Sequence, residues 1–182
     1  MSKLTLSMSE ARNAIHSELN DLLIDSLFTA RGNLEAGRLW TNVNRWLGLP
    51  ASMASAALAG GAGVSALVGD SSNLTAILAF LSAALAAVRG FLKPEEQATA
   101  YSTKGNKTLS IRNQSKLLLN VGLQLSELSD ERAYSQLRSL REDYDALLLE
   151  EPLQIPRWAY NRAKAGIERG ESDYVLKRGK GE

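Results

Sequence analysis

The sequence is poor in the residues that most often carry catalysis and metal binding. It contains no cysteine, which excludes disulfides, thiolate nucleophiles and cysteine-based zinc sites. Its only histidine is His16, and one histidine cannot supply a histidine-rich metal site or anchor a Ser-His-Asp type of triad. The sequence also offers no paired catalytic acid and base. Asp143 and Asp145 are two residues apart in a predicted helix, so they do not share a helix face. We therefore expect no enzyme, no metal and no cofactor.

The chain also lacks an excess of either charge. Its 21 basic and 20 acidic residues give a formal net charge of +1, so no bulk basic field indicates direct nucleic-acid binding. A length of 182 residues suits one domain, and we expect a single domain over residues 7–175.

Charged residues are almost absent from one long stretch of the chain. Between Trp46 and Lys93 the only charged residues are Asp70 and Arg89. The turn-like sequence GDSSN interrupts this block. The pattern predicts a helical hairpin with arms at 47–69 and 74–93 and a turn at 70–73.

This hairpin is predicted to cross a membrane. The arm LTAILAFLSAALAAVRGFL is rich in leucine, isoleucine, valine and phenylalanine, which favour insertion by roughly 3–5 kcal/mol in total. The first arm is weaker because of its glycines and serines, but it can enter as half of a hairpin. Two buried helices in a water-soluble bundle are the alternative, and the other helices would have to cover them on every side. The fold class expected is an all-α membrane protein, a two-span transmembrane helical hairpin with a cytoplasmic helical bundle.

The two arms separate bulky from small side chains. Small residues let helices approach closely in lipid, so the bulky face of the second arm should meet lipid and its small face should meet other helices. Hairpin or oligomer packing is assigned to Gly60, Gly63, Ala79, Ser82, Ala83, Ala86 and Gly90. The first arm also has a helical face made only of small side chains. This face either packs within the hairpin or lines a narrow pore through several assembled copies, and it consists of Ser52, Ser55, Ala59, Ala62 and Ala66.

The flanking charges set the expected orientation. Basic residues precede and follow the hairpin, whereas the turn holds only Asp70, which places both termini in the cytoplasm of a multi-pass membrane protein. The residues expected to anchor the membrane interface are Trp40, Trp46, Arg89 and Lys93.

Helices are predicted on both sides of the hairpin. A capping box at Ser7–Glu10 opens a helix over 7–46, and Pro50 can be the first residue of the first span. Further helices occupy 94–169, beginning at Pro94, with the last one running from about Arg157 and stopping at Gly170. Residues 170–182 are expected to form a flexible tail.

The sequence after the hairpin contains a series of short motifs: Gly105-Asn106, Leu109, Arg112-Asn113, Tyr144-Asp145, Ile155-Pro156, Ala159-Tyr160 and Ala163-Lys164-x-Gly166-Ile167. In this order, and following a weak two-span hairpin, they resemble the SLATT family, the two-transmembrane effector domains of bacterial nucleotide-signalling conflict systems, including those of the bacterial inner membrane. The likeness covers roughly residues 10–175, and one departure is Tyr101, which stands where many members have a histidine.

The resemblance implies an oligomeric effector of antiviral defence that forms a pore or perturbs the inner membrane when a sensor partner triggers it. Growth arrest or cell death would follow. Its expected partners are further copies of the chain, the lipid bilayer and a sensor or signalling protein. The main alternative is a non-conducting, membrane-anchored scaffold whose cytoplasmic helices bind a partner protein. A soluble helical adaptor is the third possibility, and an enzyme is the last.

Overall fold

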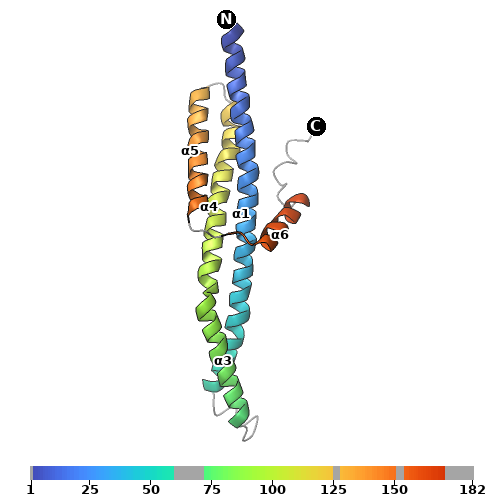
Figure 1. The fold of residues 1–182 in the computed structure, drawn as a ribbon, viewed down its shortest axis with the longest axis vertical. Helices are drawn as coiled ribbons and strands as arrows, with labels where there is room; N and C mark the ends of the chain where they lie inside the picture. The colour runs from blue at the N-terminus through green and yellow to red at the C-terminus, as the bar shows by residue number, and fades with distance from the viewer. Residues whose placement is uncertain (1, 60–71, 125–127, 151–153, 171–182) are drawn as a thin grey trace. The chain divides into compact units, whose positions relative to one another are not determined.

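The computed structural model describes residues 2–59, 72–124, 128–150 and 154–170, and in these ranges it consists of helices without strands. Figure 1 shows the elements in chain order. They are α1 (Ser2–Ala59), α3 (Ser72–Leu92), α4 (Pro94–Asn120), the 3₁₀ helix η1 (Gly122–Gln124), α5 (Asp130–Leu149) and α6 (Arg157–Glu168).

The chain divides into two compact units. Unit 1 comprises Met1–Ala36 and Tyr101–Glu182, and unit 2 comprises Gly37–Ala100. Because α1 and α4 are long, each contributes residues to both units.

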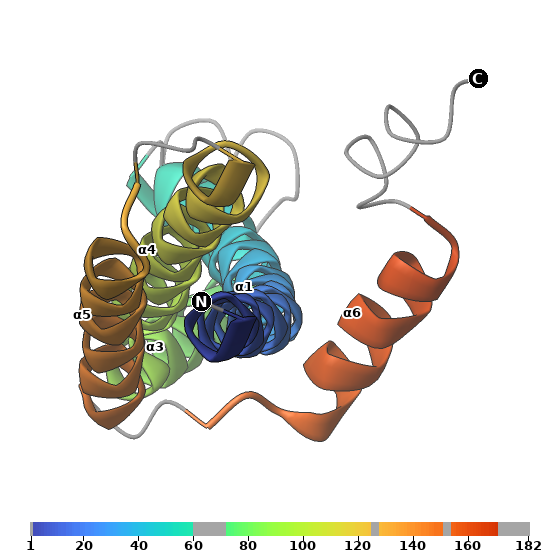
Figure 2. The same cartoon turned by 90° about the horizontal axis from the view of Figure 1, so that it is seen from above.

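Unit 1 contains the hydrophobic core. Its α1, α4 and α5 lie side by side (Figure 2). The last helix, α6, contacts α1 through Tyr160, whose ring stacks on that of Phe28 with centroids 6.0 Å apart. The buried apolar residues recur every three or four positions on α1 and α5, and Ile111 and Leu118 are seven positions apart on α4, so each set lies on one helical face. The buried core cluster comprises Ile15, Leu19, Leu22, Ile111, Leu118, Ala133, Leu137, Leu140, Tyr144 and Leu147.

Small polar residues replace the large apolar ones along part of this body. Ser26, Asn33, Thr108 and Ser115 are buried, and each donates a side-chain hydrogen bond to a carbonyl of its own helix. These bonds satisfy the buried donors without extending between helices. Gly105 lets α4 approach α1, since an added Cβ would lie 2.9 Å from the Leu34 Cγ atom and 3.2 Å from the Ala30 carbonyl oxygen.

Local chemistry explains the helix boundaries. The Ser129 hydroxyl accepts a hydrogen bond from the Arg132 amide and caps α5. Lys93, at a φ of 44°, separates α3 from α4, and Pro94 begins the next helix as predicted. Gly170, at a φ of 77°, follows the end of α6, where a left-handed conformation suits glycine.

The start of the chain differs from the sequence-based expectation. The helix begins at Ser2, ahead of the predicted capping box at Ser7, and it continues unbroken to Ala59. Pro50 lies inside this helix and is not its first residue. The predicted boundary between a helix over 7–46 and a span starting at 47 is therefore absent.

The prediction of a membrane-spanning hairpin is also wrong. In the part of the chain that the structure describes, none of the helices combines the length and the apolar character needed to cross a bilayer. The two-span transmembrane fold class and the multi-pass inner-membrane location with cytoplasmic termini are overturned by this finding. Residues 60–69 of the predicted first span lie outside the described residues. In α3, Arg89 and the many alanines and serines lower the apolar content.

Candidate interaction surface

Unit 2 differs from unit 1 in having little buried interior. Among its residues with described burial, only Gly37 and Pro94 are buried, whereas every buried core residue belongs to unit 1. Large apolar side chains instead lie exposed on the last part of α1 and on α3, the two helices that we call the hairpin. This is the feature of the structure that most requires a functional explanation, because exposed apolar patches usually indicate interaction sites.

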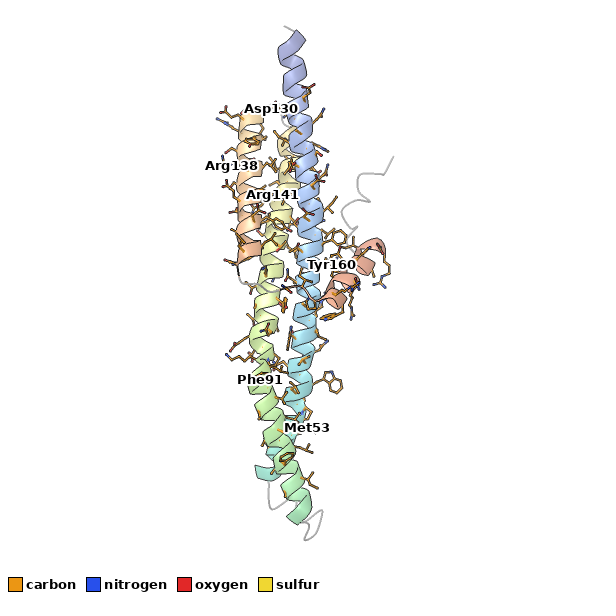
Figure 3. All side chains as sticks on the ribbon, in the orientation of Figure 1. Met53, Phe91, Asp130, Arg138, Arg141 and Tyr160 are labelled. Atoms are coloured by element: carbon orange, nitrogen blue, oxygen red, sulfur yellow. The ribbon has the colours of Figure 1, made fainter. Side chains whose placement is uncertain are left out.

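One exposed stripe follows α3. Phe80 is 74% exposed and Phe91 is 87% exposed, and Figure 3 labels Phe91 on this helix. Ile77, Leu81 and Val88 are each about half exposed. These residues are spaced at three, four and seven positions, so they share one helical face, which we call the α3 stripe.

A second stripe follows the last part of α1. Trp46 is 76% exposed and Met53, labelled in Figure 3, is 72% exposed. Leu39 and Leu49 are also exposed, and Leu39, Trp46 and Met53 are spaced by seven residues. We call these four residues the α1 stripe. Seven-residue spacing was the signal that sequence reasoning overlooked, because it treated Pro50 as the start of a new helix.

The two helices of the hairpin meet through polar groups. The hydroxyls of Ser55 and Ser82 lie 3.1 Å apart and share a hydrogen bond. The Arg89 Nε donates to the Asn44 Oδ1 at 3.1 Å, and a Cβ added to Gly48 would lie 3.6 Å from the Arg89 guanidinium. The α1 stripe lies on the opposite side of α1 from Asn44, Gly48 and Ser55, so the hairpin leaves this stripe uncovered.

The serine-containing stripe predicted on the first arm contributes to this helix contact. Ser55 bonds Ser82, whereas the exposed Ser52 donates to the Gly48 carbonyl oxygen. The side chain of Ala59 is not described. The other predicted residues of that arm lie outside the described residues: Gly60, Ala62, Gly63 and Ala66.

The small positions predicted on α3 are mostly exposed. Ala79, Ala83 and Ala86 face solvent, and a Cβ at Gly90 would meet nothing within 4 Å. Ser82 is half-buried against α1. Of the predicted interface anchors, Trp40 is half-buried, whereas Trp46, Arg89 and Lys93 are exposed.

A cavity of about 930 Å³ lies within unit 2 beside the α3–α4 junction. Its lining includes Asn44, Arg89, Lys93, Glu95 and Glu96. The Lys93 Nζ lies 3.0 Å from the Glu96 carboxylate, and the Arg89 guanidinium lies 4.0 Å from the Glu95 carboxylate. Each cation thus has an acidic neighbour. No group of three metal-ligating side chains occurs at this cavity or elsewhere among the described residues.

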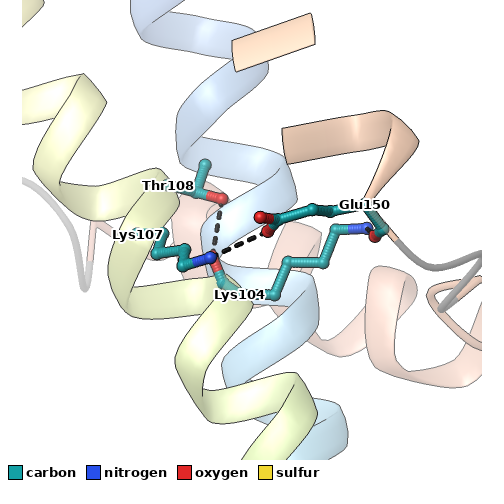
Figure 4. Close-up of polar contacts among 4 residues, drawn as sticks. All are labelled: Lys104, Lys107, Thr108 and Glu150. Carbon is teal, nitrogen blue, oxygen red and sulfur yellow. Dashed lines mark hydrogen bonds and ion pairs between the residues drawn. The ribbon is translucent and has the colours of Figure 1, made fainter. Parts of the chain in front are cut away.

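A polar cluster of unit 1 joins α4 to the end of α5 and is drawn in Figure 4. The buried Lys104 donates from Nζ to the Glu150 carbonyl oxygen at 3.0 Å, which satisfies a carbonyl at the carboxyl end of α5. The Lys107 Nζ lies 2.8 Å from the Glu150 carboxylate, and this hydrogen bond lowers the pKa of Glu150. The cluster ties α4 to the end of α5.

The motif residues of the family resemblance have packing roles. Gly105 lies at the α1–α4 contact, and Tyr144 shares a 2.8 Å hydrogen bond with Thr29 while its burial raises its pKa. Tyr101 donates to the Gln154 carbonyl oxygen at 3.1 Å. The buried face of α6 consists of Ala159, Ala163 and Gly166.

No family model, curated protein or solved structure matches the chain. Membership of the SLATT family therefore stays a prediction.

Proposed function

We propose that this chain is a non-catalytic helical interaction protein, in which unit 2 presents apolar surface to protein partners and unit 1 is the folded body. The observation that carries the proposal is the contrast between the two units. Unit 1 buries a cluster of ten residues, whereas unit 2 exposes large apolar side chains along the last part of α1 and along α3.

The exposed area supports an interaction role. At about 150–250 Å² for a whole aromatic side chain, Phe80 and Phe91 expose roughly 300 Å² between them. With its aliphatic members, the α3 stripe exposes on the order of 500–600 Å², at the upper end of the largest patch on an ordinary monomer. The α1 stripe adds a separate surface of about the same size. A monomer that works alone would not be expected to carry both.

The family resemblance adds the biological setting. Within the proposal, the chain is an effector or adaptor of a bacterial conflict system, and a sensor protein supplies the trigger. The absence of cysteine and the single histidine support association, and not catalysis, as its mode of action.

In-cell photocrosslinking tests the proposal. A photoreactive phenylalanine analogue replaces Phe91 or Trp46 in the full chain, and the matched control carries it at Arg138 on α5, whose side chain is 69% exposed. We expect protein-sized crosslinked products from the two hairpin positions and few from position 138. Equal yields at all three positions, no protein products, or crosslinks to lipid alone would refute the proposal.

A further inference from the structure

Four residues of the α3 stripe, all except Phe80, form with Ala84 a series that has the spacing of a coiled-coil seam. Ile77, Leu81, Ala84, Val88 and Phe91 follow one another at intervals of four, three, four and three residues. This is the alternation of core positions in a heptad, which packs knobs-into-holes against a second helix with the same repeat. The large members of the seam are exposed in the single chain, and Ala84 is half-buried.

We propose that α3 pairs antiparallel with the α3 helix of a second copy of this chain. The inference rests on the proposed function and names the partner of the α3 stripe. A second copy is the occupant that the seam itself specifies, because a twofold interface uses the same surface patch on both subunits. It also supplies a helix with the required repeat.

Electrostatics favours self-pairing of this surface. Arg89 is the single charged residue of α3, and it is engaged by Asn44 and faces Glu95 within its own chain. Two copies can therefore meet along the seam without bringing like charges into contact. An antiparallel arrangement also aligns the helix dipoles favourably.

The seam residues fit best when the helices run in opposite directions. Antiparallel packing places Leu81 opposite Ala84 of the second copy and Ile77 opposite its Val88, so each layer combines a larger with a smaller side chain. A parallel pair would place the two Ala84 residues in one layer and the two Phe91 residues in another. That arrangement would leave a gap in the first layer and crowd the second.

The area is sufficient for a stable dimer. A standard interface buries about 800 Å² per partner, of which roughly 60% is apolar. This requires about 500 Å² of apolar surface per copy, which the seam provides together with the exposed Phe80 beside it.

Single-cysteine variants of the full chain test the pairing, because the natural sequence has no cysteine to interfere. Ile77→Cys carrying a size tag is mixed with untagged Val88→Cys and oxidised mildly. Antiparallel pairing predicts a mixed disulfide and little self-linked product, since the two copies of residue 77 would lie about 16 Å apart along the axis. Ala86→Cys, on the opposite face of α3, is the matched control and should stay unlinked.

Sedimentation equilibrium of the purified chain gives the second readout. Leu81→Glu should raise the dissociation constant at least tenfold, whereas Ala86→Glu should leave it unchanged. Circular dichroism should show both variants folded, because neither position belongs to the core cluster.

The outcomes separate this inference from the proposed function. A monomeric purified chain, or self-linked products replacing the mixed disulfide, overturns the antiparallel α3 pair. If the same chain still crosslinks to other proteins through position 91 in cells, the interaction role stands without self-pairing. If neither crosslinks nor disulfides form, both proposals fall.

Discussion

Replacing Gly105 with alanine should destabilise the protein, although the same change favours helix formation. In an exposed helix, glycine to alanine stabilises by about 1 kcal/mol through backbone entropy. At Gly105 the new methyl group would lie 2.9 Å from the Leu34 Cγ atom and 3.2 Å from the Ala30 carbonyl oxygen. The Leu34 side chain can rotate, but the backbone oxygen of α1 cannot move without shifting the helix. Overpacking of this kind costs about 1–3 kcal/mol, so we expect a net loss of about 1 kcal/mol in the free energy of unfolding.

Urea denaturation followed by circular dichroism measures this loss. Gly90→Ala is the matched control, since an added Cβ there meets nothing within 4 Å, and it should stabilise α3 by about 0.5–1 kcal/mol. A second variant, Leu34→Ala, removes the nearest clashing atoms. It should recover part of the loss, with a coupling free energy of at least about 0.5 kcal/mol in a double-mutant cycle. If Gly105→Ala stabilises the chain as much as Gly90→Ala does, the close α1–α4 contact is refuted.

Three further predictions concern polar groups of unit 1. Tyr144→Phe removes the 2.8 Å hydrogen bond to Thr29 and should cost about 1 kcal/mol by chemical denaturation; no measurable change would show that the bond is absent in solution. Burial raises the pKa of Tyr144 and Tyr101 above 10.0, so the stabilisation from their neutral forms is complete below pH 10 and is lost as the pH rises through the higher folded-state pKa values. Stability should therefore fall above pH 10, with a shallower slope in Tyr144→Phe, and a slope equal to that of the natural chain would contradict the assignment. Lys104→Met should cost about 1.5–3 kcal/mol by thermal denaturation because it removes a charged donor from the Glu150 carbonyl oxygen, whereas Lys107→Met, at an exposed ion pair, should cost at most about 1 kcal/mol. Equal losses would show that burial does not distinguish the two lysines.

Much of the helical arrangement could be predicted because local signals act within a few residues of each boundary. Pro94 begins α4, Arg157 begins α6 and Gly170 follows the end of α6, as expected from their backbone preferences. Helical spacing predicts one apolar face on α5 made of Leu137, Leu140, Tyr144, Leu147 and Leu148; the first four are buried, whereas Leu148 is 45% exposed. Such signals do not depend on what lies elsewhere in the fold.

The prediction failed where the same pattern has two physical explanations. A stretch with only two charged residues between Trp46 and Lys93 is compatible with a bilayer or with an interaction surface, and composition alone favoured the bilayer. Pro50 is compatible with a helix start or with a position inside a helix, and in the structure α1 continues through it. Length, continuity and exposure separate these explanations, and they are properties of the folded chain.

The sequence by itself determined that the chain is helical, where most helices begin and end, and that the uncharged hairpin differs from the rest. These features follow from residue-level preferences and from spacing along one helix. Only the tertiary structure decided which residues share a core and which stay exposed. Tyr144 is buried where it bonds Thr29, a residue distant in sequence. Phe80 and Phe91 are exposed because α3 contacts α1 through a different face, by way of Ser55 and Asn44. Contacts between segments far apart in the chain set these outcomes, and no local pattern encodes them.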